Sequence, residues 1–132
     1  MDRHQSREQA FKFLFENTFE ANSAEEIMEN AEIMREEKVS KFSRNLFEGT
    51  LENLSVIDKN IDENLMGWKR ERISRTALAI LRLAIYEIMF EEDTPNKVVA
   101  NEAVELSKEY STKEESAYIN GVLGSIIRKL EA

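Results

Sequence analysis

The stretch "YINGVL", residues 118–123, decides between two interpretations of the chain's last quarter. Asn-Gly between aliphatic residues is a strong signal for a two-residue β-hairpin. The apolar residues around it nevertheless recur at i, i+3, i+4, i+7 and i+8, which is the period of a helix. They are Ile119, Val122, Leu123, Ile126 and Ile127. A hairpin would destroy that period, so the sequence predicts one helix that runs through Asn120-Gly121.

Gly121 then needs a reason, because a mid-helix glycine costs about 1 kcal/mol relative to alanine. Ala117, Gly121 and Ser125 recur at every fourth position, which places three small residues on one helix face. Two interpretations stay open. The strip either packs tightly against a neighbouring helix or forms a surface that a partner approaches closely.

The rest of the chain also has helical patterning. Only four glycines and one proline interrupt the 132 residues, and the alternation typical of strands is nearly absent. Capping signals at Ser23 with Glu26 and at Thr94-Pro95 mark helix starts, and a further helix is expected to begin near Ser40. The stretch "TALAILRLAIYEIMF", residues 76–90, is apolar nearly all round and predicts a central helix. We therefore predict an all-α fold of about seven helices.

The apolar period also predicts which side chains face inward in the first two helices, about residues 3–19 and 23–37. These are Phe11, Phe15 and Phe19 in the first, and Ile27, Ala31 and Met34 in the second. Ser55 with Asp58 predicts a further helix start, and Gly67 is expected to end that helix.

The composition is that of a soluble globular protein, with 42% hydrophobic and 33% charged residues. Eighteen Lys and Arg against 26 Asp and Glu give a net charge of −8. Such a surface repels nucleic acid and membranes on average, so RNA binding requires a local cationic patch. There is no cysteine for a disulfide or zinc site, and no apolar run reaches the roughly 18–20 residues that span a bilayer. We expect one cytoplasmic domain without metal, cofactor or membrane segment.

Three motifs in the second half resemble, in order and spacing, the NusB family of transcription antitermination factors. They are "AILRLAIYEI" (79–88), "TPNKVVANEAVELSKEY" (94–110) and "YINGVL" (118–123). "FEGTLENLSVIDKNIDENLMGW" (47–68) resembles the family's third and fourth helices. The resemblance implies one all-α domain, residues 1–132, made of two small helical bundles packed together, roughly 1–66 and 67–132.

The resemblance also implies a function. Family members bind the boxA element of nascent ribosomal RNA jointly with the small-subunit ribosomal protein NusE. The pair helps to load an antitermination complex onto RNA polymerase. We expect this chain to do the same.

The family's N-terminal basic stretch contributes to RNA binding, and Arg3, His4 and Arg7 match it, with Lys12 further along. Arg3 and Arg7 are four residues apart, so we expect both to face one run of phosphates. The alternative is a frayed terminus whose charges are merely solvated.

A second basic cluster is "WKRERISR", residues 68–75. Its cations are Lys69, Arg70, Arg72 and Arg75, which with Glu71 leave a net charge of +3. A local reversal of sign is what a polyanion site on an acidic protein needs. Trp68 would stack on an unpaired base, unless it packs on Gly67 and the bundle instead.

Arg82 is a different case, because it interrupts the most apolar helix and needs a carboxylate partner there. The candidates are Glu87, Glu102 and Glu105.

For the protein partner, the resemblance implies that Glu114 and Tyr118 form part of the surface facing NusE. One departure stands out: Ala77 occupies a position where the family commonly has an acidic residue. Glu71 or Glu87 is a candidate to replace that charge.

No catalytic motif is present. His4 is the single histidine, and neither a glycine-rich phosphate loop nor a metal-spaced set occurs, so we expect a non-enzyme. Two alternatives stay open. One is a protein–protein adapter or homodimer that covers its own RNA face. The other is kinship with the N-terminal domain of ribosomal RNA cytosine methyltransferases, whose catalytic cysteine has no counterpart here.

Overall fold

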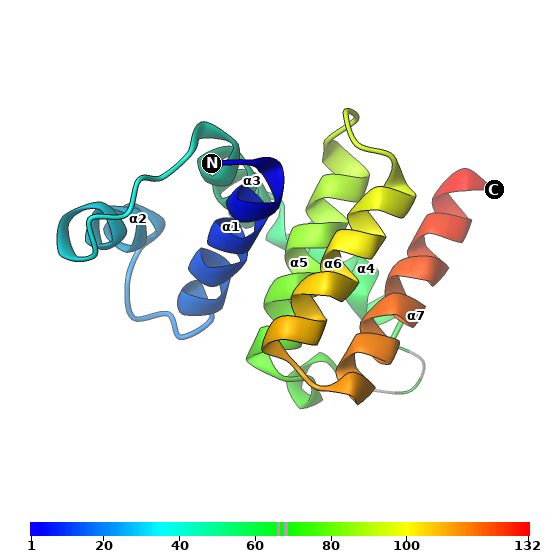
Figure 1. The fold of residues 1–132 in the computed structure, drawn as a ribbon. Helices are drawn as coiled ribbons and strands as arrows, with labels where there is room; N and C mark the ends of the chain where they lie inside the picture. Colours follow the sequence, from blue (N-terminus) through cyan, green and yellow to red (C-terminus); the bar gives the residue numbers. More distant parts are fainter. Residues whose placement is uncertain (66, 68) are drawn as a thin grey trace.

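The computed structural model describes residues 1–65, 67 and 69–132. This part of the chain forms seven α-helices and one short 3-10 helix, η1, and contains no strand (Figure 1). The elements are α1 (Arg3–Asn17), α2 (Ala24–Met34), α3 (Lys41–Glu52), α4 (Leu54–Glu63), η1 (Arg70–Arg72), α5 (Arg75–Phe90), α6 (Asn96–Tyr110) and α7 (Lys113–Glu131). The all-α prediction is confirmed, and α7 runs unbroken through Asn120-Gly121.

α5 is the central helix. It packs against α1, α3 and α4 and also against α6 and α7, so neighbours cover it on several sides (Figure 1). Ten of its 16 residues are buried, which explains why its sequence is apolar nearly all round. The division near residue 66 into two bundles stays a prediction. Within the described residues, no helix is long and apolar enough to cross a membrane.

Side-chain caps fix the helix starts. The predicted capping box is confirmed, because Ser23 accepts from the backbone N–H of Glu26 and the Glu26 carboxylate accepts from that of Ser23. Asp2 forms a second box with Gln5 at the start of α1, which the sequence analysis did not identify. The helix expected near Ser40 begins at Lys41, and Ser40 caps it through the backbone N–H of Ser43.

The predicted inward faces are partly wrong. Phe19 is 54% exposed because α1 already ends at Asn17, and Met34 is 76% exposed at the last residue of α2. Phe13 and Met28 are buried instead. The other predicted positions hold: Phe11, Ile27 and Ala31 are buried and Phe15 is half-buried.

Three boundaries also differ from prediction. α4 follows Asn53 without a side-chain cap and ends at Glu63, four residues before Gly67, whose φ is +91°. α6 begins at Asn96, so Pro95 rather than Thr94 occupies the cap.

Asp58 does not cap α4. Its carboxylate accepts two hydrogen bonds from Arg82, at 3.0 and 2.9 Å. Arg82 therefore has a carboxylate partner, as its apolar surroundings required, but on α4 rather than at Glu87, Glu102 or Glu105.

Two of the helical glycines, Gly121 and Gly49, have different surroundings. A Cβ at Gly121 would meet nothing within 4 Å, so tight helix packing does not explain this glycine. A Cβ at Gly49 in α3 would instead overlap the ring of Tyr86 in α5. The close approach of two helices is therefore at Gly49, and Gly121 lies on open surface.

Candidate nucleic-acid interface

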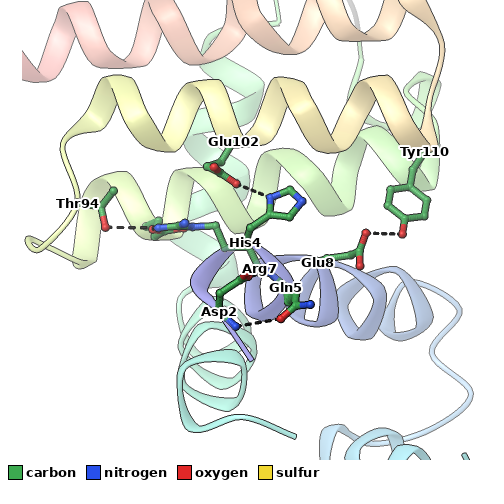
Figure 2. A network of polar contacts seen from close by, with 9 residues as sticks. Asp2, His4, Gln5, Arg7, Glu8, Thr94, Glu102 and Tyr110 are labelled. Atoms are coloured by element: carbon green, nitrogen blue, oxygen red, sulfur yellow. Dashed lines mark hydrogen bonds and ion pairs between the residues drawn. The ribbon is translucent and has the colours of Figure 1, made fainter. Parts of the chain in front are cut away.

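Arg7 lies in the interface between α1 and α5 and not on the surface. Its Nε and Nη2 donate to the two carboxylate oxygens of Glu87, at 2.9 and 2.7 Å, and the side chains are 7% and 2% exposed. Nη2 also lies 3.4 Å from the hydroxyl of Thr94 (Figure 2). The hydrogen bonds to Glu87 raise the pKa of Arg7. The expectation that Arg3 and Arg7 face one run of phosphates is therefore wrong, because Arg7 is committed to a buried ion pair.

Two further polar contacts join α1 to α6 (Figure 2). Nδ1 of His4 lies 2.9 Å from the carboxylate of Glu102, and the hydroxyl of Tyr110 donates to Glu8 at 2.7 Å. Burial and the bond to Glu8 raise the pKa of Tyr110. The N-terminal helix is thus held along its length, which argues against a frayed terminus.

The His4–Glu102 pair predicts a small pH dependence of stability. The hydrogen bond to Glu102 raises the pKa of folded His4 above 6.5. Its contribution is therefore full below pH 6.5 and is lost as the pH rises through the folded value. Because the imidazole is half exposed, we expect about 0.5 kcal/mol at most. Urea unfolding at about pH 5.5 and 8 should show this difference, and Glu102→Gln should abolish it. An equal pH dependence in both proteins would contradict the assignment.

Arg3 and Lys12 remain accessible on α1. The guanidinium of Arg3 lies 4.1 Å from the ring centroid of Phe42 in α3, and the ammonium of Lys12 lies 5.7 Å from the ring of Tyr110 in α6. Both residues are exposed, and no carboxylate of the described residues pairs with either. Their aromatic contacts lie on different neighbouring helices, so the structure does not bring the two cations together.

The second predicted cluster is divided as well. Arg70 lies 3.3 Å from both Asp58 and Asp62. Arg75 donates to the carbonyl of Thr18 at 2.5 Å and lies 4.5 Å from the ring of Phe19. These two guanidinium groups are committed to contacts within the protein.

Lys69 and Arg72 are the accessible cations of this cluster. Both are exposed, and neither has a carboxylate partner among residues 1–65, 67 and 69–132. The predicted base-stacking residue, Trp68, lies outside the described residues.

The two residues predicted to face a protein partner line a groove. Glu114 and Tyr118 border a volume of about 240 Å³ together with Arg72, Ile73 and Glu115. Burial raises the pKa of Tyr118. Arg72 of the predicted RNA set thus adjoins the predicted partner residues, whereas Ala77 is fully buried.

Ile73 and Glu115 also border this groove, although no sequence motif indicated them. Glu115 lies in the first turn of α7, where its backbone N–H donates to Thr112, and its carboxylate accepts from Ser74 at 3.0 Å. The residues "STKEE" (111–115) lie together at the start of α7, but the contact between Glu115 and Ser74 crosses 41 positions. Nothing local could have indicated it.

The described part of the chain contains no group of histidine and carboxylate side chains that could hold a metal ion. These surfaces present exposed cations, some with aromatic rings beside them, and a groove that two glutamates, Arg72 and Tyr118 border. Such a set suits contacts to phosphates and to a basic protein.

Known proteins are similar to this chain over nearly its whole length. The sequence model of the NusB family matches residues 4–128. The transcription antitermination protein NusB of Clostridium botulinum (strain Hall) is 41% identical over 143 residues, covering 96% of this chain and 100% of that protein. That of Clostridium novyi (strain NT) is 44% identical over 132 residues, covering 97% and 99%.

Solved structures share the arrangement of the helices. NusB from T. maritima superposes with a TM-score of 0.87 at 34% identity, covering 97% of this chain and 92% of that one. A crystal structure of antitermination factors NusB and NusE in complex with dsRNA gives a TM-score of 0.85, covering 98% and 99%. At 21% identity, the second likeness shows the fold alone. The resemblance inferred from the sequence motifs is thus confirmed.

Proposed function

Because the chain belongs to the NusB family, we propose that it binds the boxA element of nascent ribosomal RNA jointly with ribosomal protein NusE. In this role it helps to assemble an antitermination complex on RNA polymerase. The observation that carries the proposal is the extent of the match, since the family model spans residues 4–128. The curated relatives are named transcription antitermination proteins and align over 99% or more of their own length. A related complex contains NusB, NusE and RNA together.

The proposed RNA contacts follow from which cations are accessible. Arg3 and Lys12 on α1, and Lys69 and Arg72 around η1, are exposed and have no carboxylate partner among the described residues. A phosphate can approach each of them without displacing an internal ion pair. Arg7 is not among the proposed RNA contacts, because its guanidinium is buried and hydrogen-bonded to Glu87.

Three other cations that were predicted to bind RNA are expected to contribute less to the affinity. His4, Arg70 and Arg75 would have to exchange contacts with Glu102, with Asp58 and Asp62, and with Thr18 before they could bind a phosphate. We propose Trp68 as the base-stacking residue on the strength of its sequence position alone.

The proposed NusE surface is the groove bordered by Glu114 and Tyr118. Ribosomal proteins are basic, so the exposed carboxylate of Glu114 beside the ring of Tyr118 gives charge complementarity. Arg72 borders the same groove. An RNA strand bound to Arg72 would therefore lie next to the bound NusE, and this proximity accounts for joint binding.

Titration of boxA RNA with and without NusE tests the proposal. We expect weak binding by this chain alone and markedly tighter binding with NusE. We also expect a loss of affinity with salt that steepens by about 0.7 in the log–log slope for each phosphate contacted. A scrambled RNA is the control for base recognition. If neither RNA binds with or without NusE, while NusE itself does bind, the chain is a protein–protein adapter and the proposal fails.

A further inference from the structure

The exposed cations of α1 are separated around the helix. Arg3 and Lys12 are nine residues apart, which at 3.6 residues per turn places them about 180° from each other. The contacts agree, because Arg3 lies against Phe42 of α3 and Lys12 against Tyr110 of α6. A strand of RNA that followed α1 alone would therefore meet one of these charges and not the other.

The connection between α2 and α3 crosses α1 in this gap. The side-chain amide of Gln9 donates to the Lys38 carbonyl at 2.9 Å, and its carbonyl oxygen accepts from the backbone N–H of Ser40 at 3.3 Å. The hydroxyls of Ser6 and Ser40 are 2.8 Å apart. In Figure 1 the connection rises from α2 toward the N-terminus of the chain. Residues 38–40 are thus fixed on α1 between its two exposed cations.

Two lysines lie here, Lys38 in the connection and Lys41 at the first position of α3. Both are exposed, and neither pairs with a carboxylate in the part of the chain that the structure describes. Lys41 immediately precedes Phe42, the residue that Arg3 contacts. Glu37, which precedes Lys38, borders a hollow together with Lys12. By these contacts, the backbone positions around α1 follow the order Lys12, Lys38, Lys41 and Arg3.

Most carboxylates close to these four cations already accept hydrogen bonds or form ion pairs within the protein. Asp2 caps α1 through the backbone N–H of Gln5 at 2.7 Å. Glu37 accepts from Gln9 at 2.8 Å and lies 3.4 Å from Arg35. Glu36 adds one exposed negative charge on the α2 side.

A third cation of this region is directed elsewhere. Arg44 of α3 lies within 4.0 Å of Glu25, Glu32 and Glu48. Of the cations on α3, Lys41 is therefore the one available beside Arg3.

We propose that Lys38 and Lys41 contact RNA phosphates and join Arg3 and Lys12 into one continuous cationic arc around α1. The inference rests on the proposed function and names residues of the RNA site that the sequence motifs did not indicate. The two lysines supply positive charge in place of Arg7, whose guanidinium is paired with Glu87 and so is not available to RNA. Because lysine acts on phosphate as a point charge, this part of the site supplies affinity and not base recognition.

The test is the RNA affinity of a Lys38→Ala/Lys41→Ala variant, measured with NusE over a range of salt. Loss of two phosphate contacts should lower the log–log slope by about 1.4, so binding is roughly 25-fold weaker at about 0.1 M salt and approaches wild type near 1 M. The loss should be the same for boxA and scrambled RNA. A Lys59→Ala/Lys97→Ala variant removes two exposed lysines elsewhere that likewise have no carboxylate partner among the described residues, and it matches the change in net charge.

Failure of the proposed arc and failure of the proposed function would give different results. If the wild type binds RNA and both lysine variants bind equally well, the arc is wrong while the proposed function stands. If the wild type binds no RNA at all, both are overturned. A loss confined to the Lys38/Lys41 variant, with urea unfolding unchanged, supports the arc.

Discussion

Replacing Glu87 by alanine should lower the free energy of unfolding by about 3–5 kcal/mol, because it leaves the Arg7 guanidinium buried without its hydrogen-bonded counter-charge. A guanidinium cannot lose its proton in a protein, so deprotonation cannot relieve the free-energy cost of the buried charge. Arg7→Ala should cost less, because a carboxylic acid, unlike a guanidinium, has an uncharged form. Against a total stability of about 5–15 kcal/mol, the Glu87 change removes much of the margin. Urea unfolding, followed by circular dichroism, measures both variants.

Removing the whole pair is the matched control. Well-packed apolar residues often replace a buried ion pair at no cost or with a gain. Arg7→Met/Glu87→Met should therefore unfold near the wild-type midpoint, far above either single variant. If Glu87→Ala alone costs less than about 1 kcal/mol, the pair is not the desolvated contact that its geometry indicates.

Gly49→Ala should lower the free energy of unfolding by about 1–3 kcal/mol, because overpacking a close helix contact forces the neighbouring groups apart. The added methyl group would overlap the ring of Tyr86. That ring cannot retreat easily, since Tyr86 is 9% exposed and its hydroxyl donates to Glu91 at 3.1 Å. Burial, together with the bond to Glu91, raises the pKa of Tyr86 to about 12.

Gly121→Ala is the comparison within the same chain. It makes the same chemical change at a helical glycine, but where a Cβ meets nothing within 4 Å. Helix propensity then acts alone, and the variant should gain up to about 1 kcal/mol. Thermal unfolding of the two alanine variants should move the midpoint in opposite directions. A destabilised Gly121→Ala, or an unchanged Gly49→Ala, would contradict this account of the two glycines.

The sequence predicted the helices well because their signals are local. The period of "SAYINGVLGSIIRKL" is complete within α7, so the competing hairpin signal of Asn120-Gly121 could be rejected without tertiary information. Ser23 and Glu26 likewise form a box that depends on three residues of separation. Phe19 was misplaced because a helix end, unlike a helix period, depends on what packs beyond it.

The candidate site was predicted less completely, because several of its basic side chains are paired with carboxylates that lie far away in the sequence. Arg7 and Glu87 are 80 positions apart, and nothing in the local pattern of α1 separates Arg7 from the accessible Arg3. Arg70 and Arg72 are two residues apart, yet only Arg70 meets Asp58 and Asp62. A count of basic residues therefore overstated the charge available for RNA.

The most direct test is the salt dependence of RNA affinity, with NusE present, for two pairs of substitutions. Arg3→Ala/Arg72→Ala removes two exposed cations, and Arg7→Met/Glu87→Met removes a buried neutral pair. We predict that the first weakens binding and lowers the log–log slope by about 1.4, while the second keeps the wild-type affinity and slope. The opposite result, with RNA binding lost only when the buried pair is replaced in a stably folded protein, would contradict the account.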